Sequence, residues 1–338
     1  MLTLLLAVLA ATTPRSDSVP GTLRIAVDST HHDVLLTYTV PSGAGHDMAG
    51  MEGMEGLHEM HHGHHTERLL RFAWPVDGWV RGARVEYRDP HGHLASDVRV
   101  HHLTLLNFDR AQLVHGGIER VWAAGEETSP VMLPATVGVP LNGGTAMGLV
   151  VAYMPASMPA GTVITVRLRW TPRNTVPEPV SIIPVPLDVS GHIGASPAYD
   201  LPPGRSERAI TFRMPLTGRM LGAGGHLHDY AVELRLQDVA SGDVLVRLVP
   251  RLDSLGHVLS VPQKLFGISG GGRRLVRGRE YRVVAVYDNP TGDTLVDGAM
   301  GEMGVAFMPD HLRDWPPLRP SDPGLIADLK RLDELGRS

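Results

Sequence analysis

Short segments in which apolar and polar residues alternate recur along most of the chain. A period of two puts every second side chain on one face, which is typical of a β-strand that covers a core on one side. Turn residues separate these segments at intervals of roughly a dozen residues, a spacing that predicts antiparallel sandwiches and not βαβ units. The clearest predicted strands are 22–28, 34–40, 80–88, 163–170, 208–214, 230–238 and 280–288. We therefore predict an all-β protein.

Proline divides the predicted strands into two groups. The stretch 171–188 (TPRNTVPEPVSIIPVPLD) cannot form a central strand, because proline removes a donor from the hydrogen-bond ladder. The helix pattern at 323–337 is amphipathic, and we expect this short helix to pack on the surface. The predicted parts are an N-terminal β domain at 20–172, a linker at 173–184, a C-terminal β domain at 185–312 and a tail at 313–338.

Composition limits the chemistry that the chain can perform. The 338 residues carry a net charge of −5, no cysteine, 18 histidines and 14 methionines. The mild negative charge argues against a nucleic-acid partner, which needs a basic face. No internal apolar run reaches the roughly 18 residues of a spanning helix, so we expect no membrane span in the mature chain. The absence of cysteine excludes disulfides, thiolate catalysis and iron–sulfur clusters, which leaves imidazole, thioether and carboxylate as metal ligands.

The first residues predict export. Leu2 to Ala11 form a short apolar run with small residues near its end, and the polar segment TTPRSDS follows. We interpret residues 1–19 as a signal peptide and leader, which puts the mature protein in the periplasm or outside the cell. A lipid-side anchor and a misassigned start codon are the alternatives.

A low-complexity insert interrupts the N-terminal domain at residues 43–65. Glycine spacers separate its histidines and methionines, so we predict a mobile loop without a packed core. Imidazole and thioether groups suit weak binding of copper or nickel, and a solvated loop without metal is the alternative. Its lower-ranked candidate ligands are His58, His61, His62, His64 and His65, accompanied by His46, Met48, Met51, Met54 and Met60.

Two histidine motifs lie on predicted strands. His226 and His228 are two residues apart in GGHLHDY, so a strand would put both imidazoles on one face, where they can bind one ion. His101 and His102 are neighbours, and joint ligation by this pair requires a bulge or a local twist. The alternatives are two hydrated surface histidines in the first motif, and one core and one surface histidine in the second.

A methionine completes the candidate set. Met303 in GEMGVAF would be core filler in most proteins, but a thioether beside two imidazoles suits copper. Met300 and Glu302 compete for the same role. Asp229 and Tyr230 are candidates for orienting an imidazole, because they directly follow the second motif.

These motifs in this order resemble the copper type II, ascorbate-dependent monooxygenases, the family of the peptidylglycine alpha-hydroxylating and dopamine beta-monooxygenases. The resemblance covers roughly residues 70–310. It implies two antiparallel jelly-roll-like β-sandwich domains, each with one copper, facing each other across a cleft. By resemblance, His101 and His102 would bind the electron-transfer copper. His226, His228 and Met303 would bind the catalytic copper that activates dioxygen.

The chain departs from this family at the first copper. The family has a third histidine on a later strand of the first domain, where this sequence has Tyr153 and Met154 in GLVVAYMPAS. Met154 is a candidate soft ligand in its place, and His115 is the nearest other imidazole. The family's disulfides are also absent, which indicates a distant relative, of bacterial type.

Three functions follow from the sequence. The first is an exported copper monooxygenase that draws electrons from ascorbate or another reductant and acts on a small molecule or a peptide. The second is a copper-binding or copper-handling protein that has kept the fold without the reaction. The third is a β-sandwich adhesion or scaffold module without metal.

Overall fold

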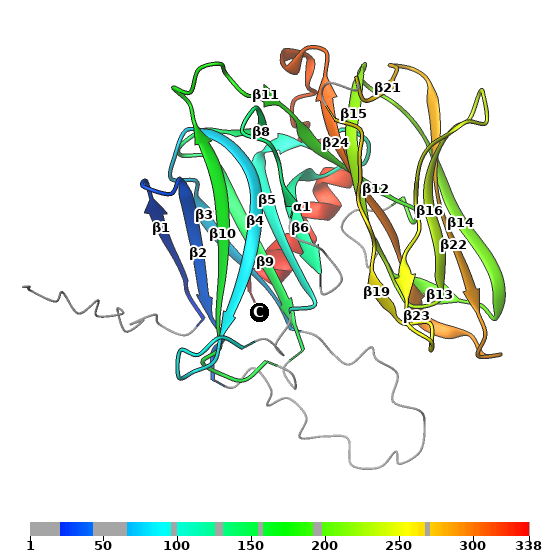
Figure 1. Ribbon diagram of the computed structural model, residues 1–338, viewed down its shortest axis with the longest axis horizontal. Coiled ribbons are helices and arrows are strands. Elements are labelled where there is room, and N and C mark those ends of the chain that lie inside the picture. The colour runs from blue at the N-terminus through cyan, green and yellow to red at the C-terminus, as the bar shows by residue number, and fades with distance from the viewer. Residues whose placement is uncertain are drawn as a thin grey trace, which may run out of the picture.

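The predicted all-β architecture is confirmed in a computed structural model of the chain. The structure describes residues 21–42, 66–95, 100–125, 131–154, 158–191, 198–267 and 271–337. The predicted signal peptide and the His/Met insert at 43–65 lie outside the described residues. Nearly all strand pairs are antiparallel, and a single α-helix stands near the C-terminal end of the described residues. Figure 1 shows two sandwiches side by side, with the helix behind the first.

The first sandwich contains two sheets around one core. One sheet has the strand order β1-β2-β10-β4-β8-β11 with β7 beside β4, and the other has the order β3-β9-β5-β6. Val34, Leu36 and Tyr38 alternate along one strand and are fully buried, as the period of two predicts. The strands are β1 (Leu23–Asp28), β2 (Asp33–Thr39), β3 (Thr66–Ala73), β4 (Gly78–Arg88), β5 (His102–Ala111), β6 (Ile118–Gly125), β7 (Val131–Met132), β8 (Val137–Leu141), β9 (Ala146–Tyr153), β10 (Val163–Pro172) and β11 (Val180–Ser181).

The second sandwich has the same layered construction. Its first sheet has the order β12-β24-β15-β20 with β21 beside β15, its second sheet has the order β14-β22-β16-β17, and two short pairs flank them. The strands are β12 (Ile183–Asp188), β13 (Tyr199–Leu201), β14 (Gly204–Arg213), β15 (Gly218–Leu227), β16 (Ala231–Asp238), β17 (Val244–Leu248), β18 (Arg251–Leu252), β19 (Val258–Ser260), β20 (Lys264–Leu265), β21 (Arg273–Leu275), β22 (Glu280–Asn289), β23 (Leu295–Ala299) and β24 (Gly301–Pro309). A second buried apolar cluster fills the space between the two large sheets.

The proline-rich stretch contributes strands at the edges of sheets. The sequence predicts a linker at 173–184, but β11 pairs in parallel with β8, and β12 begins at Ile183 and includes Pro184 and Pro186. β12 is the outermost strand of its sheet and pairs only with β24. Proline is tolerated there, because one side of an edge strand needs no ladder donors.

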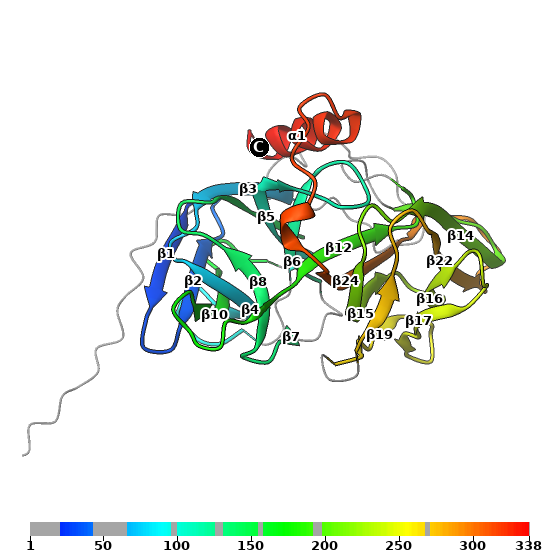
Figure 2. The same cartoon turned by 90° about the horizontal axis from the view of Figure 1, so that it is seen from above.

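The C-terminal helix fastens the end of the chain to the first sandwich. Helix α1 (Pro323–Leu335) buries Leu325 and Leu332 against the outer face of the sheet β3-β9-β5-β6. Figure 2 shows the helix from above, beside this sheet. Asp322 caps its N-terminus and accepts hydrogen bonds from two backbone N–H groups of the first turn. The helix therefore connects the two sandwiches, because the chain reaches it directly after β24 and a short 3-10 turn, η2 (Leu312–Asp314).

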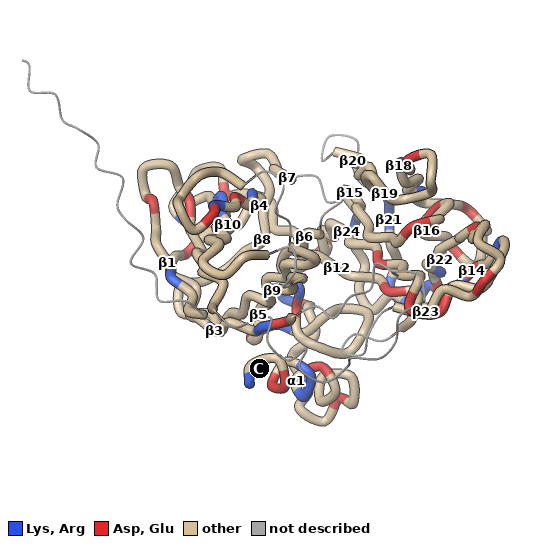
Figure 3. Tube along the Cα trace, turned by 90° about the horizontal axis from the view of Figure 1, so that it is seen from below, with Lys and Arg blue, Asp and Glu red and all other residues tan. Residues whose placement is uncertain are grey.

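The first sheet of the second sandwich faces the first sandwich. Leu221 belongs to the core of the first sandwich, and Ala306 and Met308 pack against that core. In the other direction, Leu113 from the β5–β6 loop enters the core of the second sandwich. Figure 3 shows acidic and basic residues interspersed over both sandwiches. Within the described residues, no helix combines the length and the apolar character that a membrane crossing requires.

Candidate metal centre

Four histidines from the two sandwiches form one continuous cluster. The ring centroids of His101 and His102 are 4.1 Å apart, and the ring of His102 lies 5.1 Å from that of His226. The ring of His226 in turn lies 5.3 Å from that of His228. The contact between His102 and His226 crosses from the first sandwich to the second. We call these four residues the histidine cluster.

The end of β15 explains the arrangement of the second motif. His226 lies on β15 and His228 directly follows it, while Leu227 between them points into the core of the second sandwich. Alternation therefore puts both imidazoles on the face that looks toward the first sandwich. This agrees with the shared face that the sequence predicts for the HxH motif.

The start of β5 explains the arrangement of the first motif. His102 is the first residue of the strand and pairs with Ala152 and Gly125, whereas His101 lies in a bend before the strand. Because His101 stands outside the ladder, its side chain is not forced to the face opposite His102. The bend at His101 thus allows its ring to lie beside that of His102.

Neighbouring rings in the row are spaced roughly as two ligands of one ion would be, but the four rings do not form a metal site as they stand. In the described part of the chain, no group of three or more His, Asp or Glu side chains stands arranged to hold a metal ion. An imidazole bound at about 2.0–2.1 Å has its centroid roughly 3.2 Å from the ion, so two ligands at roughly 90–110° have centroids roughly 4.5–5.2 Å apart. Of the three neighbouring spacings, 5.1 Å lies within this range, 5.3 Å lies just above it and 4.1 Å lies below it. One ion shared by all four imidazoles would therefore need the rings to rearrange.

Burial shields part of the histidine cluster from water. The Nε2 atoms of His102 and His226 and the Nδ1 atom of His228 are inaccessible to solvent, although each residue as a whole is half-buried. Ring nitrogens in such a position interact more strongly with a cation than nitrogens in bulk water, because the local dielectric constant is lower.

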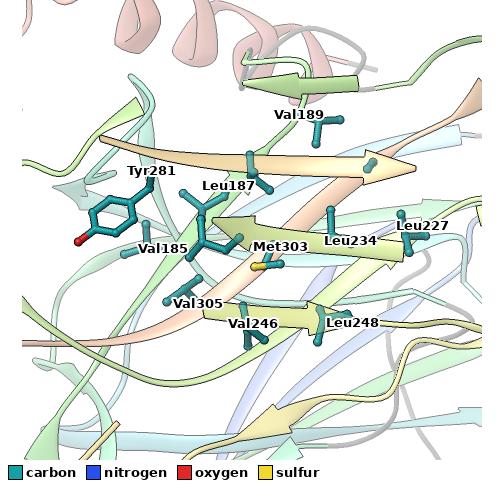
Figure 4. Packing of buried hydrophobic residues seen from close by; sticks show 14 of the residues in the cluster. Val185, Leu187, Val189, Leu227, Leu234, Val246, Leu248, Tyr281, Met303 and Val305 are labelled. Carbon is teal, nitrogen blue, oxygen red and sulfur yellow. The ribbon is translucent and has the colours of Figure 1, made fainter. Parts of the chain in front are cut away.

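Met303 is not part of the histidine cluster, in contrast to the expectation from the sequence. It pairs with Gly225 across β24 and β15, whereas His226 pairs with Glu302. Directly paired residues share a face, so Met303 points to the opposite side of the sheet from His226. Its side chain is fully buried, and Figure 4 shows its sulfur among the core residues Leu187, Leu234, Val246 and Val305. The candidate ligand set therefore excludes Met303.

Two carboxylates continue the row of side chains from His226. The register pairs His226 with Glu302, and Glu302 with Asp188 on β12. All three side chains lie on the face toward the first sandwich, and such directly paired Cβ atoms are about 4.5–5.5 Å apart. Glu302 is thus in reach of the His226 imidazole, where a carboxylate can orient a ligand by accepting a hydrogen bond. From the sequence alone, we expect Glu302 only as an alternative metal ligand in the place of Met303.

His115 meets this row from the first sandwich. It is nearly buried in the β5–β6 loop, and its Nε2 accepts a hydrogen bond from the backbone N–H of Asp188 at 3.3 Å. This bond ties the β5–β6 loop to β12, whereas Tyr153 and Met154 lie at the end of β9. His115 therefore acts as a contact between the sandwiches.

Tyr153 and Met154 occupy different environments. Tyr153 is fully buried in the core of the first sandwich, where burial raises the pKa of its hydroxyl and the neighbouring Tyr38 adds to the shift. Met154 directly follows β9, two residues beyond the partner of His102 on the neighbouring strand. Of the two, Met154 is the residue on the side of the sheet that carries His102.

Hydrogen bonds to other segments of the second sandwich hold the turn that follows the HxH motif. The carboxylate of Asp229 accepts a hydrogen bond from the backbone N–H of Val258 at 2.8 Å, so one of its oxygens holds the backbone of the turn. Tyr230 has a φ of 65°, a left-handed conformation that is rare for an aromatic residue. Its N–H donates to the carbonyl of Gly256 at 2.8 Å and its carbonyl accepts from the N–H of Asp288 at 2.9 Å.

Asp188 makes the stability of this interface depend on pH. It is 3% exposed, and burial raises the pKa of its carboxyl to about 7, with a further contribution from the charge of Glu302. Because the folded pKa exceeds the ordinary value of 3.8, the folded state holds a proton that the unfolded state loses first. The free energy of unfolding should therefore fall between about pH 4 and 7, by up to about 4 kcal/mol, and level off above.

The variant Asp188→Asn tests this prediction. Its amide oxygen can still accept the hydrogen bond from the N–H of Ser190, but it does not titrate. We expect urea unfolding to show a smaller loss of stability between pH 5 and pH 8 in Asp188→Asn than in the wild type. Asp243→Asn, at an exposed turn, is the matched control. Equal pH slopes in the wild type and Asp188→Asn would contradict the prediction.

Comparisons with known proteins add little on function. No family model and no curated protein matches this chain. Among solved structures, the chain is similar to the major capsid protein P2 from bacteriophage PM2, with 10% sequence identity and a TM-score of 0.30. That match covers 70% of this chain and 92% of the capsid chain.

Proposed function

We propose that this protein is a copper-binding protein whose main site is a single centre between the two sandwiches. His101 and His102 from the first sandwich and His226 and His228 from the second would supply the ligands. The observation that carries the proposal is the unbroken row of four imidazoles, with the 5.1 Å contact between His102 and His226 at its middle. Such a centre would also hold the two sandwiches together, because each donates half of the ligands.

The ligand chemistry favours copper over other divalent metals. Imidazole suits copper, zinc, nickel and iron, and of the divalent first-row ions copper binds most tightly to a given set of nitrogen ligands. With Met303 in the core, the centre has no thioether from that position, which favours Cu(II) over Cu(I). Glu302 beside His226 adds a negative charge that partly offsets the charge of the cation. We propose an exported setting for this function from the sequence of residues 1–19.

Metal loading of the untagged chain tests the proposal. After loading with Cu(II) and removal of weakly held ions by a competing chelator, we expect one copper per chain and an electron paramagnetic resonance spectrum of nitrogen ligands. Deleting residues 43–65 should lower the stoichiometry before the chelator step and leave the tight copper unchanged. Retention of zinc in preference to copper, or of no metal at all, would overturn the proposal.

A copper monooxygenase is the second candidate function. It is favoured by one specific observation: the two histidine pairs come from two different sandwiches, as the resemblance implies. The resemblance implies two copper ions separated by a cleft. That arrangement would need the rings of His102 and His226 to be more than 5.1 Å apart, so this candidate requires the sandwiches to open. Reductant-dependent oxygen consumption that disappears in His226→Ala would favour it over simple copper binding.

A further inference from the structure

We infer that Tyr287 is the positioning residue of the histidine cluster, through its hydroxyl group, which holds the backbone of His228 in place. This inference rests on the proposed function for its effect on metal binding. The observation that supports it is a set of hydrogen bonds to the backbone, in which the imidazoles take no part. Tyr287 lies on β22, in the sheet of the second sandwich that carries none of the four histidines.

The hydroxyl of Tyr287 makes three hydrogen bonds to the backbone. It accepts from the N–H of His228 at 3.0 Å and from the N–H of Met300 at 3.1 Å. It also donates to the carbonyl oxygen of Met300. A tyrosine hydroxyl has one donor and two acceptor sites, so this group is fully used.

The hydroxyl of Tyr287 makes these bonds at the point where the hydrogen-bond ladder between β15 and β24 ends. The last pair between β15 and β24 joins Leu227 and Gly301, so His228 and Met300 would form the next pair of the ladder. The Tyr287 hydroxyl stands between them and connects both N–H groups. The ring itself is buried, 1% exposed, and reaches this point across the core from the opposite sheet. The position of His228 is thus set by the core of the second sandwich and not by the strand alone.

A ligand held in this way binds metal with less loss of freedom. Residues beyond a strand end fray, and ordering the backbone of one residue costs about 1–2 kcal/mol. The Tyr287 hydroxyl restrains His228 before the ion arrives, so that mainly the ring has to rotate. Groups that orient ligands in this way typically change metal affinity by about 10–100-fold when removed.

Tyr287→Phe tests the inference, with Tyr281→Phe as the matched control. Tyr281 lies on the same strand, is equally buried and hydrogen-bonds through its hydroxyl to the N–H of Val276, away from the histidine cluster. We expect Tyr287→Phe to bind Cu(II) about 10–100-fold more weakly than the wild type and to change the electron paramagnetic resonance spectrum. Tyr281→Phe should keep the affinity and the spectrum of the wild type.

Hydrogen exchange of the metal-free protein gives an independent readout. The amide protons of His228 and Met300 should exchange faster in Tyr287→Phe and at the wild-type rate in Tyr281→Phe. If the wild type does not bind copper, the proposed function fails while the exchange result still tests the positioning role. Wild-type exchange at His228 in a folded Tyr287→Phe protein, or unchanged copper affinity and spectrum in that variant, would overturn the inference.

Discussion

Alanine at His102 and alanine at His226 are expected to have the same effect, the loss of the tight copper site of the whole chain. The two side chains belong to different sandwiches, yet their rings are 5.1 Å apart. If one ion uses both, either substitution removes a ligand from the same centre. Loss of a ligand exceeds the 10–100-fold effect of losing a group that orients one, so we expect affinity to fall by more than about a hundred-fold. Copper per chain after chelator competition is the measurement.

The double variant separates one shared site from two independent ones. Substitutions that disable one site are not additive, so His102→Ala with His226→Ala should lose no more tight copper than either single variant. His93→Ala is the control, because this imidazole is 79% exposed and contacts Asp89 on the surface of the first sandwich. If His102→Ala kept one copper at wild-type affinity, the two pairs would be separate sites and the shared centre would be refuted.

The largest effect on stability is expected from Asp328→Ala. The carboxylate of Asp328 on helix α1 is fully buried and binds both terminal nitrogens of Arg120, at 2.5 and 2.6 Å. It also accepts a hydrogen bond from the backbone N–H of Ile118 at 2.9 Å. Removing the carboxylate leaves a largely buried guanidinium without its counter-charge, which typically costs about 3–5 kcal/mol. Chemical denaturation measures the change in the free energy of unfolding.

Asp333→Ala on the same helix provides the comparison. Asp333 pairs with Arg71 at 2.7 Å, but both side chains are about half exposed, and such pairs contribute about 0–1 kcal/mol. Asp328→Ala should also loosen α1 from the sheet, so that limited proteolysis cuts the chain before the helix. Similar stabilities of the two variants would show that the buried pair contributes no more than a surface pair.

Local pattern was enough to predict most of the fold. Alternation with a period of two identified the main strands, and Pro323 with the amphipathic residues that follow it indicated α1. The strand position of His226 likewise predicted that it shares a face with His228. These features depend on neighbours along the chain, whose geometry within a strand or helix is nearly the same in every protein.

Long-range pairing decided the composition of the histidine cluster. The register of β15 against β24 put Glu302 beside His226 and sent Met303 into the core, and a shift of one residue would have reversed both. No signal near Tyr287 in the sequence connects it to His228, because the hydrogen bond crosses from one sheet to the other. The resemblance suggested two separate copper sites, but the packing of the sandwiches brought His102 and His226 together. The sequence by itself therefore indicated which residue types were candidate ligands, whereas their neighbours depended on how two sheets pair and how two sandwiches pack.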